Sequence, residues 1–156
     1  MTRRAPSARG RGAATIEFAL MLPLLVTLML GIWDYGRLVE ANQVLTNAAR
    51  EAGRQCSTAQ KGTSSVQTVA LNYLTRAGVP TTGVTVAVSN LTNSSRADPS
   101  GASQLDKYEV VVTMPSNNVR LILMNSLIGP GTITARCTWS SMVDIPVSVP
   151  ASIPLN

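Results

Sequence analysis

The stretch Gly12–Cys56, GAATIEFALMLPLLVTLMLGIWDYGRLVEANQVLTNAAREAGRQC, decides the fold of this chain. It contains no charged residue from Phe18 to Trp33. The apolar block counted from Ala13 to Trp33 would be about 30 Å long as an α-helix. This length is about the thickness of the hydrocarbon core of a bilayer. The block therefore predicts a single transmembrane helix over residues 13–33.

Beyond the span the same stretch changes from uniformly apolar to amphipathic. Apolar positions recur at helical spacing, with charged and amide side chains between them. The apolar set is Tyr35, Leu38, Val39, Leu45, Ala48, Ala49 and Ala52. Asp34, Arg37 and Glu40 are spaced three apart, so they can form ion pairs along the exposed face. We expect one helix that continues from the membrane through residues 34–58 into a packed domain.

The distribution of charge sets the expected orientation. The chain has 156 residues and a net charge of +5, and arginines crowd into residues 1–12, where no acid offsets them. Positive residues beside a span stay on the cytoplasmic side, so the N-terminus is expected in the cytoplasm and the C-terminal domain outside it. The rest of the chain is close to neutral, which gives no basis for nucleic-acid binding.

Small residues precede the apolar block, whereas a secretory signal peptide has its small-residue cleavage site after that block. They are Gly10, Gly12, Ala13 and Ala14. Gly12, two small residues, Thr15-Ile16-Glu17-Phe18 and a long apolar helix resemble a type IV prepilin processing site. The resemblance implies a leader, residues 1–12, that a prepilin peptidase removes by cutting between Gly12 and Ala13. Glu17 would then stand near the start of the mature chain.

The similarity extends to the TadE-like family, minor pseudopilins of tight-adherence (Flp-type) pilus systems. The motifs are G-A-A-x-x-E-F-A-L-x-L-P-L-L, then G-I-x-D-Y-G-R-L, then V-L-T-N-A-A-R-E-A. The match is carried by Gly12, Glu17, Phe18, Pro23, Gly31, Tyr35, Gly36, Arg37, Ala48, Ala49, Arg50 and Ala52. Asp34 stands where a glutamate is commoner, and the residues after Cys56 carry no motif of the family.

Membership of this family implies a single-pass protein of the bacterial inner membrane with a periplasmic domain. It would act in pilus assembly through helix packing. The implied partners are the membrane, a prepilin peptidase, other pseudopilins or pilin subunits, and the pilus assembly machinery. Two other functions stay open: an uncleaved, membrane-tethered envelope adaptor, and a ligand-binding module whose helix is only a tether.

The resemblance also implies that Glu17 and Phe18 set helix register in an assembly. The amine released at Ala13 can pair with Glu17 of a neighbouring subunit, which would offset the cost of an ionisable group in a span. The alternative is that Glu17 is the interfacial end of a membrane helix and reaches the headgroups. Pro23 removes one backbone hydrogen bond and predicts a kink, or a weak point that lets the helix stretch on packing into a fibre.

Cys56 and Cys137 fit an exported domain, because an oxidising compartment would allow them to pair. Such a bond would fasten the long helix to the sheet and stabilise the fold by about 4 kcal/mol in the chain-entropy model. The alternative is two buried free thiols.

Residues 59–145 predict a small α+β domain outside the membrane. Val66, Val69, Ala70, Tyr73 and Leu74 form one helical stripe, with Ser64 and Gln67 as a capping box and Gly78 near the C-cap. Alternating residues predict three antiparallel strands, over 83–89, 108–114 and 133–139. A second short helix is expected at about 119–127, and the proline-rich tail, 146–156, is expected to be extended.

The residue types argue against an enzyme. The chain contains no histidine, the commonest general base and zinc ligand. Its acids are scattered, and it has no phosphate-binding glycine loop and no nucleophile elbow. We therefore expect no catalytic residue, no metal site and no cofactor.

Overall fold

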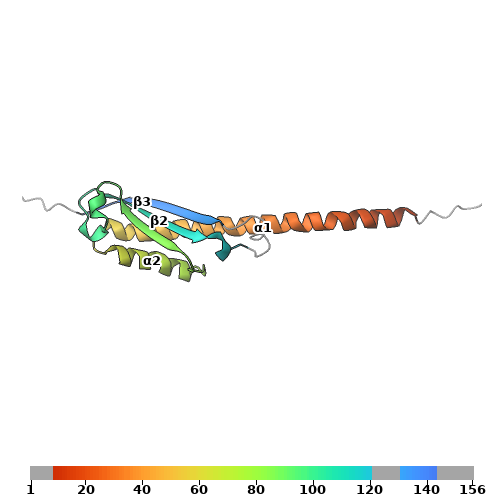
Figure 1. The fold of residues 1–156 in the computed structure, drawn as a ribbon, viewed down its shortest axis with the longest axis horizontal. Helices are drawn as coiled ribbons and strands as arrows, with labels where there is room; N and C mark the ends of the chain where they lie inside the picture. The colour runs from red at the N-terminus through yellow and green to blue at the C-terminus, as the bar shows by residue number, and fades with distance from the viewer. Residues whose placement is uncertain (1–8, 121–130, 144–156) are drawn as a thin grey trace, which may run out of the picture.

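The computed structural model of the chain describes residues 9–120 and 131–143. Its longest element is helix α1, Arg9–Ser57, which runs from the apolar block into the folded domain without interruption (Figure 1). This is the single rod predicted from the change of pattern after Trp33. The helix begins at Arg9, before the predicted processing site. The proline-rich tail and all but the start of the predicted helix at 119–127 lie outside the described residues.

The three predicted strands are confirmed, with ends that differ from the prediction by one or two residues. They are β1 (Thr85–Asn90), β2 (Lys107–Pro115) and β3 (Thr132–Ser140). Both neighbouring pairs are antiparallel, and the strand order is β1-β2-β3. Val88, Val110 and Cys137 lie side by side in one row of this sheet.

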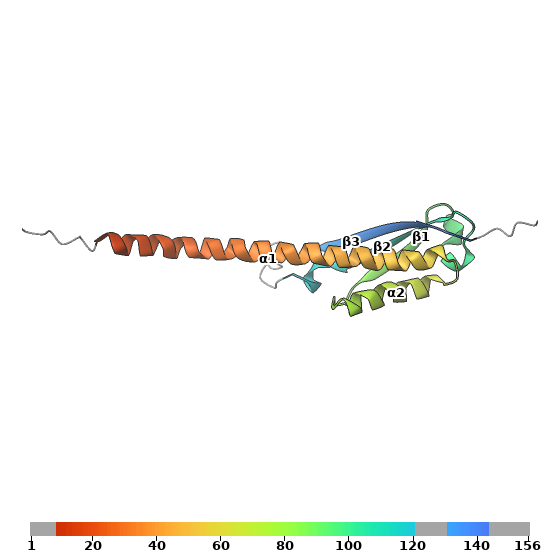
Figure 2. The same ribbon diagram turned by 180° about the vertical axis from the view of Figure 1, so that it is seen from behind.

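Helix α1 and helix α2 (Thr63–Arg76) pack on the same face of the sheet, and α2 lies beside the second half of α1 (Figure 2). The sheet contributes mainly large buried side chains, and α1 contributes mainly alanines together with Leu45. The buried residues of β2 are Tyr108, Val110, Val112 and Met114; those of α1 include Ala41, Leu45, Ala48, Ala49 and Ala52. Because alanine projects so little, the backbone of α1 can lie close to the strands.

The two ends of α2 differ in how well they follow the prediction. The N-cap of this helix is Gly62, and no side chain caps it by a hydrogen bond. The prediction that Ser64 and Gln67 form a capping box is therefore wrong. Gln67 Nε2 instead donates to the carbonyl of Val86 at 2.9 Å and ties α2 to β1. At the other end Gly78 has φ +73°, and Val79 N donates to the carbonyl of Leu74 at 3.0 Å. This left-handed C-terminal turn is the one that the glycine predicted.

Candidate functional site

The predicted processing site lies on the first turns of α1. Gly12, Ala13, Glu17 and Phe18 are all exposed, and the ideal Cβ position at Gly12 has no heavy atom within 4 Å. Ala13 and Glu17 are one turn apart, so their side chains lie on the same face of the helix. The segment is therefore accessible to a peptidase or to a neighbouring helix.

The apolar half of α1 is exposed along nearly its whole length. Every described side chain from Gly12 to Met29 is exposed, including Phe18 at 62% and Met29 at 68%. Soluble proteins rarely leave so large an apolar surface in water. The helix is long and apolar enough to cross a membrane. This fits a membrane-anchored protein.

Pro23 lies within this apolar segment, and α1 continues through it. Its missing N–H removes one hydrogen bond of the helix. One turn further along the helix, the hydroxyl of Thr27 donates a hydrogen bond to the carbonyl oxygen of Pro23 at 2.8 Å. Whether the helix bends or stretches at this residue in an assembly stays a prediction.

The first acidic residue after the apolar block contacts the segment that follows β2. Asp34 Oδ2 lies 3.8 Å from Nε of Arg120, and the two side chains are 5% and 15% exposed. The sequence suggested an ion pair between Asp34 and Arg37, but the carboxylate faces Arg120. The pair joins the membrane-proximal part of α1 to the chain that follows β2.

The two cysteines are not joined to one another in the structure. Cys56 is fully buried, and burial raises the pKa of its thiol to about 11. Cys137 is half-buried, and its Sγ accepts a hydrogen bond from Nε1 of Trp139 at 3.0 Å. The disulfide expected between them stays a prediction.

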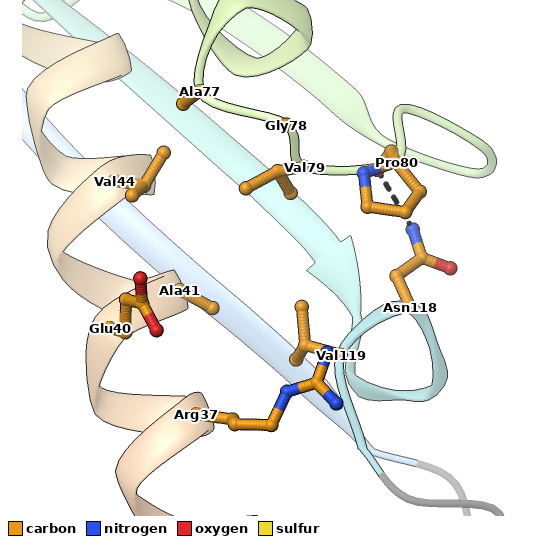
Figure 3. A pocket seen from close by; sticks show the side chains of 10 residues that line it. All are labelled: Arg37, Glu40, Ala41, Val44, Ala77, Gly78, Val79, Pro80, Asn118 and Val119. Carbon is orange, nitrogen blue, oxygen red and sulfur yellow. Dashed lines mark hydrogen bonds between the residues drawn. The ribbon is translucent and has the colours of Figure 1, made fainter.

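A groove opens where α2 ends, between α1, the turn that follows α2 and the turn that follows β2 (Figure 3). Its volume is about 240 Å³. Seven of its ten lining residues are apolar, two are charged and one is an amide; the residues are Arg37, Glu40, Ala41, Val44, Ala77, Gly78, Val79, Pro80, Asn118 and Val119. Asn118 Nδ2 donates to the carbonyls of Pro80 and Thr82, at 3.2 and 2.8 Å, and holds one wall in place.

The sequence did not predict this groove, because its walls come from three separate segments. Arg37 and Glu40 were expected only as members of an exposed face. Within the described part of the chain, no group of three or more His, Cys, Asp or Glu side chains could hold a metal ion. The groove offers a ligand both apolar side chains and polar atoms.

Comparison with known proteins finds a match for the N-terminal segment. A family model described as TadE-like protein matches residues 12–54. No curated protein and no solved structure matches the chain. The matched range contains the predicted processing site, the apolar block and most of the part of α1 that packs on the sheet, while α2 and the three strands follow it. Residues 12–54 are therefore a TadE-like segment, as the motifs within them predicted.

Proposed function

We propose that the protein is a non-enzymatic, membrane-anchored component of a tight-adherence (Flp-type) pilus system. The observation that carries this proposal is that the TadE-like match, residues 12–54, lies wholly within one uninterrupted helix, α1. The first part of this helix is apolar and exposed, and its second part packs on the sheet.

The finer proposal is that a prepilin peptidase cuts between Gly12 and Ala13, and that the mature protein acts in pilus assembly through helix packing. The exposed first turns of α1 support it, because the peptidase needs access to this segment. In the assembly the new amine of Ala13 would pair with Glu17 of a neighbouring subunit. The domain would lie in the periplasm, with the leader on the cytoplasmic side.

Intact mass of the membrane-extracted protein tests the cleavage, in cells with and without the prepilin peptidase. We expect loss of residues 1–12 only when the peptidase is present. Gly12→Val should block this loss without disturbing the fold, because the space around Gly12 is open. Gly31→Ala is a matched control within the span, also in open space, and should be cut normally. An uncut chain in both strains would leave an uncleaved tether or adaptor.

Glu17→Ala separates an assembly role from a tether. The side chain is exposed, so the substitution should leave the folded domain and membrane insertion intact. An assembly component should lose pilus formation. A ligand-binding module held by a passive anchor should keep its activity.

A further inference from the structure

We propose that the groove at the end of α2 binds the Tyr35–Val39 ridge of a second copy of this chain. The ridge consists of Tyr35 and Val39, one turn apart on α1 and exposed at 69% and 41%. Val39 and Gly53 are two heptads apart and so share one flank of the helix. Gly53 lies against Trp139 of β3, which places the ridge on the β3 flank.

The groove lies on the other flank of the same helix. Arg37, Glu40 and Val44 line it together with the turn that ends α2. The next turns on this flank, at Glu51 and Gln55, also face α2. One molecule therefore presents a ridge on one side and a groove on the other, so copies can join head to tail in an open series.

The chemistry of the two surfaces is complementary. The groove of about 240 Å³ can hold one aromatic ring, since cavities of about 150 Å³ bind benzene. Tyr35 would bring an apolar ring and one hydroxyl donor. Ala77, the C-cap of α2, lines the groove, and this end of a helix is the negative end of its dipole. An uncharged phenol that can donate a hydrogen bond suits this end, and the ridge brings no charge into the groove.

The size of the contact explains why the second copy must also be anchored. A stable interface in solution buries about 1,200 Å² or more, far above what one tyrosine and one valine supply. Anchoring in one membrane restricts the copies to similar heights and raises their effective concentration. The spans can then provide the remaining contact, and the domain alone would stay monomeric.

The heights of the ridge and the groove set the offset between copies. On α1 the ridge is centred near Arg37 and the groove near Ala41, so the second copy is displaced by about one helical turn, roughly 5–6 Å. The same displacement brings Ala13 of that copy level with Glu17 of the first. This agreement rests on the proposed function, because it needs the cleavage; the contact of ridge and groove does not.

Photo-crosslinking of the full-length protein in membranes tests the contact. A benzophenone amino acid replaces Tyr35 in one tagged copy, and a second copy carries a different tag. We expect an adduct between the two tags, mapped by mass spectrometry to 77–80 or 118–119. Benzophenone at Asn47, an exposed position on α1 outside the groove lining, is the matched control and should give no adduct there.

Ala77→Arg fills the groove and should reduce this adduct at least about tenfold, the loss expected for a central contact. Ala77 is exposed, and a cation suits the end of α2, so the variant should fold. Thr75→Arg adds the same charge at an exposed position outside the groove and should keep the adduct.

An adduct between position 35 of both copies would show a symmetric ridge-to-ridge contact and overturn the proposal. So would an adduct only to lipid, or a folded, inserted protein without an adduct to the groove. The intact mass reports the cleavage separately, so cleavage without the adduct would remove this contact and leave the proposed function standing.

Discussion

Gly53 of α1 and Trp139 of β3 occupy adjoining space so closely that a side chain on the glycine would overlap the indole. A Cβ built at Gly53 would lie 2.1 Å from Cδ1 and 2.4 Å from Nε1 of Trp139. The same Nε1 donates to Sγ of Cys137. The glycine therefore sets how closely the end of α1 approaches the sheet.

We expect Gly53→Ala to destabilise the domain by about 2 kcal/mol, because the ring is held between α1 and Cys137 and must shift or push α1 away. Denaturant unfolding of the protein in detergent micelles measures the change. Gly36→Ala is the control: its surroundings are open, and alanine favours the helix by up to about 1 kcal/mol. Equal effects at the two glycines would contradict the close approach.

Breaking the contact between Asp34 and Arg120 should loosen the domain next to the membrane. Asp34→Asn leaves the largely buried guanidinium of Arg120 facing a neutral group, and we expect a loss of about 2 kcal/mol. The free energy of unfolding and limited proteolysis after Arg120 report it. Arg37→Gln changes an exposed charge on the same helix and should cost less than about 0.5 kcal/mol.

A double-mutant cycle with Arg120→Gln isolates the interaction of the two side chains. Additive losses in the double variant would show that Asp34 and Arg120 do not interact.

The two thiols should react with iodoacetamide at very different rates. Near pH 8 Cys137 should be labelled first, because Cys56 is fully buried and its pKa is raised to about 11. Burial of Cys56 favours the neutral thiol in the folded state. The contribution of this thiol to the free energy of unfolding is therefore complete below the ordinary cysteine pKa of 9.0, and it is lost as the pH rises through about 11. The alkaline loss of stability should be smaller in Cys56→Ala than in the parent.

Intact mass after labelling in denaturant should show two labels on the parent protein. An unlabelled parent that takes up two labels only after reduction would establish the disulfide instead.

Removing the hydroxyl of Tyr108 should release the loop that precedes β2. This hydroxyl donates to the carbonyls of Arg96, at 3.0 Å, and of Asp98, at 3.3 Å, from a fully buried ring. Tyr108→Phe keeps the ring and should cost about 1 kcal/mol. Hydrogen exchange of amides 94–101 should rise while that of β2 stays nearly unchanged. Uniform loss of protection across the sheet would show that the effect is on the core instead.

The elements that the sequence predicted best depend on local patterns. The uncharged run to Trp33 predicted the helix that contains it, the alternation in β2 predicted that strand, and Gly78 predicted the left-handed turn at its own position. Local pattern was misleading at Ser64 and Gln67, because Gln67 reaches a strand that follows it in the chain. It also favoured Arg37 as the partner of Asp34, when the tertiary fold brings Arg120 to the carboxylate.

The candidate site divides in the same way. Gly12, Glu17 and Phe18 could be singled out from order and spacing alone, because their roles belong to one exposed helix. The groove could not, because Val44, Val79 and Val119 meet only after α2 has folded back along α1 and β2 has ended beside them. The sequence around each of these three valines does not indicate that they lie close together.

Because α1 is one unbroken helix, its apolar half and the folded domain are rigidly connected. With 49 residues the helix is about 70 Å long, and roughly half of it lies beyond the apolar block. A rotation of the buried half about its axis turns the sheet by the same angle, and a small tilt in the bilayer becomes a sideways displacement of the far end of the domain. In a membrane-anchored protein, the orientation of the apolar segment in the bilayer would therefore set the orientation of the folded domain.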